Sequence, residues 1–530
     1  MNLAPFPKAN YEAGTFIAVE IAGFPIGAQS ILDAARILPY IAAPVTNEEA
    51  GKHLEWPLIR ACCRKGVALF WPFRLILSRI IHAKTRLVSL GRLARIAKCE
   101  WILTQYCEER EAPMADSTFV FTIAARNYLG LVTVLFNSVK AHCGDVKFCC
   151  FVVDGFDSDE EIPIALRGSV VDCRKLGVPR FEEMAFKYDV VEFSTALKPF
   201  IFRHIFKVEG YSRAVYLDPD LKLFENLEWL EKRLNSKSIV VTPHLLNIEE
   251  NHLTSLGRAH AVDPGLFLFS GDFNLGFIAI KNDASGMAFV DWWGNVLLEQ
   301  CFYDTCRNLC VDQKWVNLVT GFFGEQLEIS RDPGANVAYW NLHERRFSKD
   351  LKGHFFVNGS SLKFIHFSNI DLSEKDGIAN GLLKNRNIDQ RTHPECAELY
   401  SSYIAEVLAA GHVERKMNTP YRFNYFDGGL TINKLHRRLF ATLIASDEKQ
   451  SPFSEASYFY RLLKKKGLLN KDSKFTNVKI SDESNLGRKR KILERIFYLL
   501  FKLLGTKKYL ALLSELRRIG TLENNTFLIK

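Results

Sequence analysis

The sequence has no apolar run long enough to cross a bilayer. The longest candidate begins at Gly66 and is interrupted at Arg74, whereas a spanning helix needs ~20 consecutive apolar residues. The chain also does not open with a basic segment, an apolar segment and a small-residue cleavage site. We therefore expect a protein that is neither exported nor embedded in a membrane.

The chain also lacks any Cys-x-x-Cys pair. Several of its 12 cysteines, such as Cys149 and Cys150, lie inside apolar segments. This usage is typical of reduced thiols, so we expect a cytoplasmic protein. Cys301, Cys306 and Cys310 are close in sequence, but no pair of histidines accompanies them, and we interpret them as packing residues and not as zinc ligands.

Acidic residues are scarce at the two ends of the chain, where its positive charge is concentrated. The net charge is +9, but residues 60–99 carry ten Lys or Arg and no acid, and residues 488–518 carry ten and only two acids, which leaves −9 elsewhere. A mildly acidic middle argues against nucleic acid as a partner. Basic ends with interleaved apolar residues favour an anionic membrane surface, which we expect to be the inner face of the membrane.

Composition and length predict several folded units. The chain has 530 residues, of which 48% are apolar and 24% are charged, enough for a large core. No internal repeat or low-complexity tract is present. We expect a helical basic extension at 1–115, a main domain at 116–375, a loop-rich region completing or capping it at 376–471, and a linker with a long basic amphipathic helix at 472–530. A helix docked on the main domain is the alternative for each basic end.

The middle of the chain alternates between strand and helix patterns, which predicts an α/β fold with a mainly parallel, buried sheet. The predicted helices are Tyr128 to His142, one opening near Pro199 and one through Trp292 and Trp293. The predicted strands are Thr118 to Ala124, Lys147 to Asp154, Ser169 to Asp172, Arg213 to Leu217, Ser238 to Thr242, Asn274 to Ile280 and Lys363 to His366.

Two carboxylates, Asp218 and Asp220, end the fourth of these strands. Successive side chains of an extended chain point to opposite faces, so these two share a face, and Pro219 between them stiffens the exit of the strand. Mg²⁺ and Mn²⁺ prefer oxygen ligands and are typically held by one or two carboxylates together with substrate phosphates. The pair therefore predicts a cation site for a nucleotide diphosphate, with an ordinary polar turn as the alternative.

Four motifs in order resemble the metal-dependent glycosyltransferases of the GT-A fold, and they are most similar to glycosyltransferase family 8 and its bacterial relatives. The resemblance covers about residues 118–371, roughly half of the chain. It implies a GT-A-type sheet flanked by helices. The motifs are Tyr216 to Asp220, Phe273 to Phe277, Asp312-Gln313 with Asn317, and Phe364 to Phe367.

The resemblance assigns Asp218, Asp220 and His366 to one Mn²⁺ or Mg²⁺ ion bound with the diphosphate of the donor. A late strand delivers His366 to the same edge of the sheet, and Mn²⁺ accepts a nitrogen ligand where Mg²⁺ prefers water. His244 and His343 are rivals for the third position.

Further roles follow from the same resemblance. Asn274 and Gly276 correspond to the segment that approaches the donor sugar, and a plain strand start is the alternative. Asp312 and Gln313 correspond to the catalytic pair beneath the sugar, where they stabilise positive charge at the anomeric carbon. The alternative for Asp312 is a helix N-cap.

The segment Ala125-Arg126-Asn127 follows the first strand, where the family holds the base and ribose of the donor, although Asn127 also suits a simple helix cap. We predict that Lys198 opens a helix whose first turn faces an anion. The alternative is a lysine that is exposed to solvent. The sequence departs from the family after His366, because the Gly and Lys-Pro-Trp stretch that grips the diphosphate is missing. The phosphate-binding lysine is therefore not identified.

The resemblance implies a glycosyltransferase that moves a sugar from a nucleotide-diphosphate donor, with UDP the expected nucleotide. The acceptor would be a hydroxyl of a surface glycan or a lipid-linked molecule, and the anomeric configuration would be retained. One alternative is a sugar nucleotidyltransferase, although the loop after the first strand lacks the glycines that such enzymes use for phosphate. The other is an inactive membrane-associated scaffold.

Overall fold

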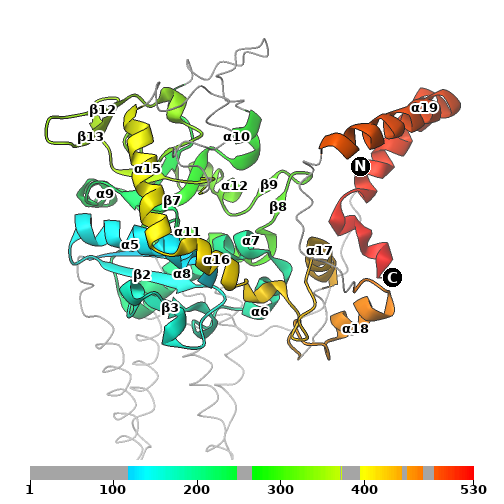
Figure 1. Ribbon diagram of the computed structural model, residues 1–530, viewed down its shortest axis with the longest axis horizontal. Helices are drawn as coiled ribbons and strands as arrows, with labels where there is room; N and C mark the ends of the chain where they lie inside the picture. Colours follow the sequence, from blue (N-terminus) through cyan, green and yellow to red (C-terminus); the bar gives the residue numbers. More distant parts are fainter. Residues whose placement is uncertain are drawn as a thin grey trace, which may run out of the picture. The chain divides into compact units, whose positions relative to one another are not determined.

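The computed structural model describes residues 117–247, 265–370, 372, 394–443, 450–469 and 483–529, without the side chains of 483–491 and 523. These residues belong to one compact unit, Glu111–Lys530 (Figure 1). The predicted N-terminal basic extension lies outside the described residues, as do most of the predicted linker and the loop at 248–264.

A mixed sheet of seven strands forms the centre of the main domain. Its order is β10-β6-β7-β4-β1-β2-β3. All neighbours pair in parallel except β7, which runs antiparallel to both β4 and β6. The strands are β1 (Thr118–Ala124), β2 (Lys147–Val152), β3 (Val170–Asp172), β4 (Arg213–Leu217), β6 (Ile239–Pro243), β7 (Phe273–Lys281) and β10 (Leu327–Ile329).

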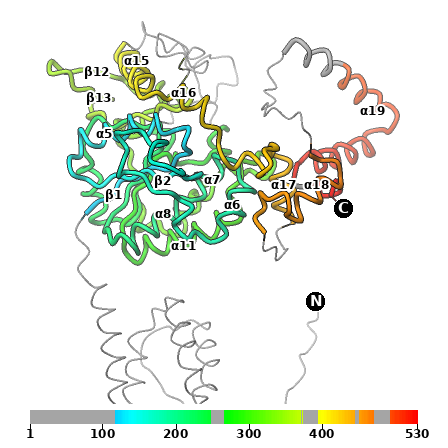
Figure 2. The backbone as a smooth tube through the Cα atoms, turned by 60° about the horizontal axis from the view of Figure 1, so that its bottom comes forward, coloured from blue at the N-terminus to red at the C-terminus, as the bar shows by residue number. Residues whose placement is uncertain are grey.

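Helices cover both faces of this sheet, so the predicted α/β fold with a mixed sheet flanked by helices is confirmed (Figure 2). The alternation of side chains along β1 shows the two faces, because Phe119 and Phe121 pack into one core cluster and Val120 into the other. The first cluster includes α6 (Phe181–Lys187), α7 (Val190–Ala196), α8 (Lys198–His204) and α11 (Ala284–Gln300). The second includes α5 (Leu129–Cys143) and α9 (Glu228–Leu234).

Local sequence signals explain where several of these helices begin. Asp189 caps α7 by accepting hydrogen bonds from the backbone N–H groups of Val191 and Glu192, and the Glu192 carboxylate accepts in return from the Asp189 N–H. Pro199 lies in the first turn of α8, where its missing N–H has no helical partner to lose. The predicted strands and the predicted helix after β1 agree with the structure to within two residues at each end.

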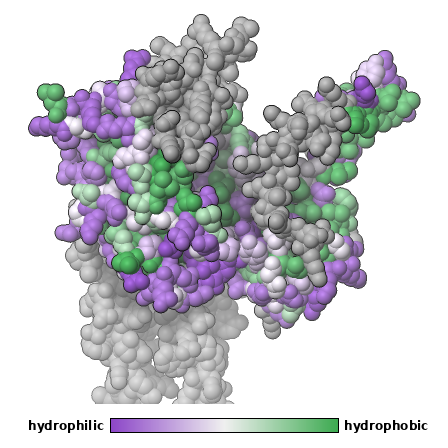
Figure 3. All heavy atoms as spheres, in the orientation of Figure 1, coloured by the Kyte–Doolittle hydropathy of each residue, from purple (hydrophilic) through white to green (hydrophobic). Residues whose placement is uncertain are grey.

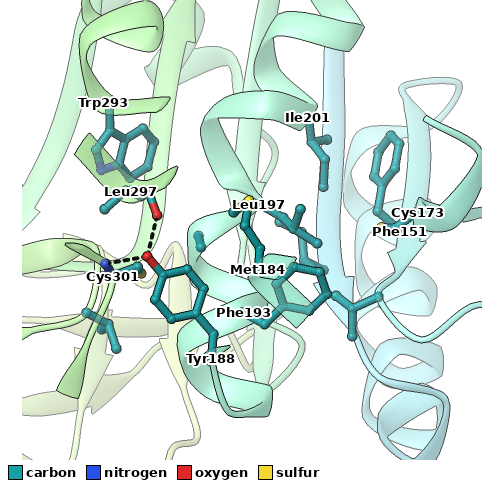
Figure 4. Close-up of a cluster of buried hydrophobic side chains, with 14 of the residues drawn as sticks. Phe151, Cys173, Met184, Tyr188, Phe193, Leu197, Ile201, Trp293, Leu297 and Cys301 are labelled. Carbon is teal, nitrogen blue, oxygen red and sulfur yellow. Dashed lines mark hydrogen bonds between the residues drawn. The ribbon is translucent and has the colours of Figure 1, made fainter. Parts of the chain in front are cut away.

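Tyr188 joins two helices in the core beneath the sheet. Its hydroxyl donates to the Leu297 carbonyl at 2.8 Å and accepts from the Cys301 N–H at 3.0 Å (Figure 4). Met184 and Trp293 are fully buried in the same cluster. This hydroxyl is therefore satisfied inside an apolar environment, as a buried polar group must be.

A smaller sheet, β11-β15-β5, lies at the edge of the main sheet where β4 ends. It consists of β5 (Leu221–Leu223), β11 (Val337–Ala338) and β15 (Phe364–His366), and β15 runs antiparallel to β5. Between residues 265 and 361 the chain also forms several short helices and strands. These are α10 (Gly265–Ser270), α12 (Gln313–Val316), α13 (Val319–Phe322), β8 (Tyr303–Asp304), β9 (Leu309–Cys310), β12 (Phe347–Lys349), β13 (Phe355–Val357) and β14 (Ser360–Ser361).

The described part of the region after residue 393 packs on the main domain. Its helices are α15 (Pro394–Ala409), α16 (His412–Asn418), α17 (Lys434–Leu443) and α18 (Tyr458–Lys465). Side chains of α15 share a buried cluster with α5 and β15, whereas those of α17 and α18 share one with α6 and α7. We interpret this region as completing the core of the main domain.

The C-terminal helix α19 (Glu483–Ile519) differs from the single long helix that we expected. Its backbone breaks at Gly505, where φ is +67°, a left-handed value that glycine adopts without strain. The rings of Phe497 and Phe501 both contact the ring of Tyr509 across this break. Residues 483–519 therefore form two helical segments that meet at Gly505, which we call the C-terminal hairpin.

No helix among the described residues combines the length and the apolarity that a bilayer crossing requires.

Candidate active site

The two predicted carboxylates lie in a short turn between β4 and β5. The Asp218 N–H donates to the Gly276 carbonyl of β7 at 2.7 Å, and the Asp218 carbonyl accepts from the Leu221 N–H at 3.1 Å. The backbone of the turn is therefore held by neighbouring strands. The side chains of Asp218 and Asp220 are 27% and 24% exposed, so a ligand from solvent can reach them.

His366 completes a group of three potential metal ligands with Asp218 and Asp220. β15 pairs with β5 so that His366 lies opposite Leu221, directly after the carboxylate turn. Its Nε2 lies 3.1 Å from Asp220 Oδ1 and 3.7 Å from Asp218 Oδ2, and one ligand atom from each residue lies within 4.8 Å of the others. Two carboxylates and one imidazole are a donor set that a divalent cation can occupy.

Asn274 orients the imidazole of His366 in this site. Asn274 Oδ1 accepts from the Gly276 N–H at 3.1 Å and from Asn336 Nδ2 at 3.1 Å, and it lies 3.2 Å from His366 Nδ1. An amide oxygen only accepts, so Nδ1 carries the proton. In the neutral ring, Nε2 is then the nitrogen that could bind a cation beside the two carboxylates, as in a metal-bound histidine.

Gly276 is needed because the site is crowded above β7. A Cβ at this position would lie 2.4 Å from His366 Cε1 and 2.8 Å from Asp218 Oδ2. These separations are far below van der Waals contact, and any side chain here would displace the imidazole or the carboxylate. Gly276 and Asn274 of β7 therefore form one wall of the predicted cation site.

The charges of the three groups act on one another. Burial opposes ionisation of Asp220, but the His366 imidazole outweighs it and lowers the pKa of Asp220. Burial likewise opposes protonation of His366, but the Asp220 and Asp218 carboxylates outweigh it and raise the pKa of His366. Both directions have the same cause, which is that the carboxylates favour positive charge beside them.

Lys198 and Asp312 form a buried ion pair next to the carboxylates. Lys198 Nζ donates to Asp312 Oδ2 at 2.8 Å and to the Leu275 carbonyl at 2.7 Å, and both charged side chains are 2% exposed. Lys198 is therefore not a solvated lysine, and Asp312 does not cap α12 through its side chain. Burial raises the pKa of Asp312 although the Lys198 ammonium acts in the opposite direction.

Tyr216 connects this ion pair with the carboxylate turn. The Lys198 ammonium lies 4.3 Å from the centre of the Tyr216 ring, and the Tyr216 hydroxyl donates to Asp218 Oδ1. The predicted catalytic carboxylate Asp312 and the predicted ligand Asp218 are therefore joined through two buried side chains. The amide nitrogen of the predicted partner Gln313 donates to the Ser270 carbonyl at 2.7 Å.

The predicted donor segment at Ala125, Arg126 and Asn127 follows β1, which pairs with β4. The Arg126 N–H donates to Asp154 Oδ1 at 2.9 Å, and its guanidinium forms ion pairs with Asp154 and Glu161. Ala125 is buried, and Asn127 Oδ1 is buried without a hydrogen-bond partner among the described residues. The residue at the N-cap of α5 is Tyr128 and not Asn127.

Neither rival histidine joins the metal-ligand group found among the described residues. His244 is packed edge to face against Trp340, which in turn packs against His366. Burial lowers the pKa of His244 to about 4, so it is a neutral core imidazole. His343 follows Leu342 in a short helical turn.

Asn336, which is not among the predicted residues, reaches the site from the turn before β11. Its Nδ2 bridges Thr242 Oγ1 at 2.8 Å and Asn274 Oδ1 at 3.1 Å, and the residue is 1% exposed at a φ of +52°. The available signal was the Gly-Ala-Asn sequence of a turn, because asparagine tolerates the left-handed region better than most residues. Its contact with Asn274, 62 residues away, has no local signature.

No protein-family model matches the chain. The Bacillus subtilis protein described as uncharacterized protein YfnF is 26% identical over 229 residues, which cover 42% of this chain and 69% of that protein. Galactosyltransferase LgtC, solved with donor and acceptor sugar analogs, is 14% identical with a TM-score of 0.32, covering 54% of this chain and 95% of LgtC. Mouse xyloside xylosyltransferase 1 is 13% identical with a TM-score of 0.32, covering 48% of this chain and 98% of that one. At these values the case for an activity rests on the residues of the site.

Proposed function

We propose that this protein is a metal-dependent glycosyltransferase of the GT-A type, related to glycosyltransferase family 8, that uses a nucleotide-diphosphate sugar. The convergence of Asp218, Asp220 and His366 at the carboxyl end of β4 carries this proposal. Ligands of α/β sheets bind at the carboxyl ends of the strands. The expected donor is a UDP-sugar, and the expected cation is Mn²⁺, with Mg²⁺ as the alternative.

A bound cation would neutralise the charge that develops on the departing diphosphate. Asp218, Asp220 and His366 would hold it, with Asn274 fixing the imidazole. The backbone of the turn is held by a hydrogen bond from Asp218 to β7 and by the pairing of β5 with β15. Such preorganised charge is a large contribution to catalysis.

In this proposal Asp312 acts near the donor sugar and not near the departing diphosphate. Its carboxylate, paired with Lys198 and coupled to Asp218 through Tyr216, provides negative charge next to the site of the sugar. Gln313 adjoins it along α12. In the retaining mechanism that the family resemblance implies, these groups stabilise the positive charge that develops at the anomeric carbon.

The decisive experiment is calorimetry of the chain with UDP-glucose, UDP-galactose, UDP-N-acetylglucosamine and GDP-mannose, with and without Mn²⁺. We expect one UDP-sugar to bind only with Mn²⁺ and to be slowly hydrolysed to UDP and free sugar. Release of pyrophosphate from UTP and a sugar 1-phosphate would instead establish a nucleotidyltransferase. If none of the nucleotides binds, the inactive membrane-associated scaffold becomes the preferred interpretation.

We also propose that the C-terminal hairpin holds the enzyme on an anionic membrane, where a lipid-linked acceptor is available. Apolar side chains are exposed along both of its segments, beside hydrophilic ones (Figure 3). Leu499 and Leu503 are 59% and 82% exposed. Between residues 492 and 519 the hairpin carries six Lys or Arg and two acids. Exposed apolar area combined with positive charge is the composition of membrane-surface helices.

Vesicle sedimentation tests this membrane contact. We expect the wild-type chain to bind vesicles that contain phosphatidylserine and to bind phosphatidylcholine vesicles weakly, with affinity falling as salt increases. Leu499→Glu with Leu503→Glu should weaken binding by about tenfold or more, because two apolar contacts become repulsive charges. Leu351→Glu, at an exposed loop position of the main domain, is the matched control. Equal binding by the double variant would rule out the hairpin as the membrane anchor.

A further inference from the structure

Two buried tyrosines of α15 have hydroxyl groups without a partner. Tyr400 and Tyr403 are each 1% exposed, and neither hydroxyl forms a hydrogen bond among the described residues. A phenol buried without a partner loses its hydrogen bonds to water and gains none in return, which destabilises the folded chain. Phenylalanine would fill the same space without that loss. The two hydroxyls therefore suggest a ligand.

Both phenols lie next to the carboxylate site. The Tyr403 ring stacks on Phe367 with 3.9 Å between centroids, and the Tyr400 ring packs on its edge at 4.9 Å. Phe367 follows His366 in sequence, and its N–H donates to the Asp220 carbonyl at 2.9 Å. Burial, together with the charge of Asp220, raises the pKa of both tyrosines. The hydroxyls therefore stay protonated and act as hydrogen-bond donors.

The same side of the site also carries the predicted nucleotide segment. Tyr128 directly follows Asn127, and its ring packs edge to face on His412 of α16 at 5.6 Å. Burial and the charge of Asp220 also raise the pKa of Tyr128. The helix pair α15 and α16 therefore adjoins both the carboxylate turn and the loop after β1.

Three lysines on the elements around the site are already paired with carboxylates and so have less need of a further anion. The pairs are Lys198 with Asp312 on α12, Lys222 with Glu406 on α15, and Lys363 with Asp332 before β11. A buried neutral hydroxyl is a suitable partner for a phosphate oxygen, because it donates a hydrogen bond without adding a buried charge. A divalent cation would require acceptors and not donors at these positions.

We propose that Tyr400 and Tyr403 donate hydrogen bonds to the diphosphate of a nucleotide bound at the carboxylate site. This inference rests on the proposed function. The two tyrosines would supply the contact to the diphosphate for which the sequence indicates no lysine. The ligand class is a nucleoside diphosphate, alone or carrying a sugar. The two hydroxyls hold the phosphate oxygens on the side of α15.

Tyr400→Phe, Tyr403→Phe and the double variant test this contact with UDP as the probe. We expect each single variant to weaken Mn²⁺-dependent UDP binding by about tenfold, since a hydrogen bond to a charged group is lost. Mn²⁺ affinity without nucleotide, measured by electron paramagnetic resonance, should not change. The thermal midpoint of the free variants should be equal to or above that of the wild type, because an unpartnered hydroxyl has been removed.

Tyr188→Phe is the matched control, because its hydroxyl has two partners in the core (Figure 4). It should lower the thermal midpoint and leave UDP binding unchanged. If the wild type binds UDP and the α15 variants bind it equally well, the diphosphate contact is wrong while the proposed function stands. A fall in Mn²⁺ affinity without nucleotide would place the hydroxyls in the cation site instead. If the wild type does not bind UDP at all, both proposals fail.

Discussion

Asp220→Asn is expected to abolish the binding of Mn²⁺ and, with it, the binding of UDP-sugars. The substitution keeps the size of the side chain and removes the charge of one of three ligands. Removing a group that only supports a metal ligand typically lowers metal affinity by about 10- to 100-fold, so loss of a ligand itself should exceed about 100-fold. Titration of Mn²⁺ followed by electron paramagnetic resonance measures this directly, and release of UDP measures the accompanying loss of turnover.

The control for this variant is Asp145→Asn, an exposed aspartate in the turn between α5 and β2. It makes the same chemical change far along the chain from the carboxylate turn, and it should leave Mn²⁺ affinity unchanged. Circular dichroism should be the same for both variants, since the backbone of the turn at Asp218 is held by β7 and not by the Asp220 side chain. An Asp220→Asn protein that bound Mn²⁺ like the wild type would refute the assignment of the metal site.

The carboxylate turn could be predicted from sequence because its determinants are local. The apolar run that ends at Leu217 predicts a strand, and the alternation of side chains places Asp218 and Asp220 on one face. The structure has β4 at the predicted residues. His366 lies 146 residues after Asp220, and no local rule pairs them. Only the resemblance of its strand to a family motif indicates that it joins the carboxylates.

Other parts of the site could not be predicted because they depend on contacts between distant segments. Lys198 and Asp312 are separated by 114 residues, and nothing near either residue indicates an ion pair. The prediction that Asn274 contacts the donor sugar stands beside a contact that has no local signature, since its amide oxygen also lies 3.2 Å from His366 Nδ1. The break at Gly505 was missed for a different reason, since one glycine in a long amphipathic pattern is compatible with a continuous helix.

A second buried ion pair ties the region after residue 393 to the main domain. Arg438 of α17 and Glu192 of α7 are fully buried, and Arg438 forms two hydrogen bonds with the Glu192 carboxylate. The same carboxylate accepts from the backbone N–H groups of Asp189 and Tyr303. Every lone-pair direction of the buried charge is therefore used, which is the condition under which such a pair is tolerated.

Arg438→Met is expected to lower the free energy of unfolding by about 3–5 kcal/mol, since it leaves the Glu192 carboxylate buried and unpaired. Urea denaturation followed by fluorescence measures this change. The comparison variant is Arg203→Ala, which breaks an ion pair with Asp291 at the surface, where the two side chains are 60% and 46% exposed. It should cost less than about 1 kcal/mol, because water and salt screen exposed charges.

Adding Glu192→Gln to Arg438→Met separates the effect of the buried charge from the effect of lost packing. The amide introduced at this position would be neutral, and its oxygen would still accept from a backbone N–H group, so no buried charge would remain unpaired. The double variant should therefore be more stable than Arg438→Met alone. If it is equally unstable, the helix α17 is held by the packing of Arg438 against Phe302 and its neighbours, and the ion pair contributes little to the attachment of this region.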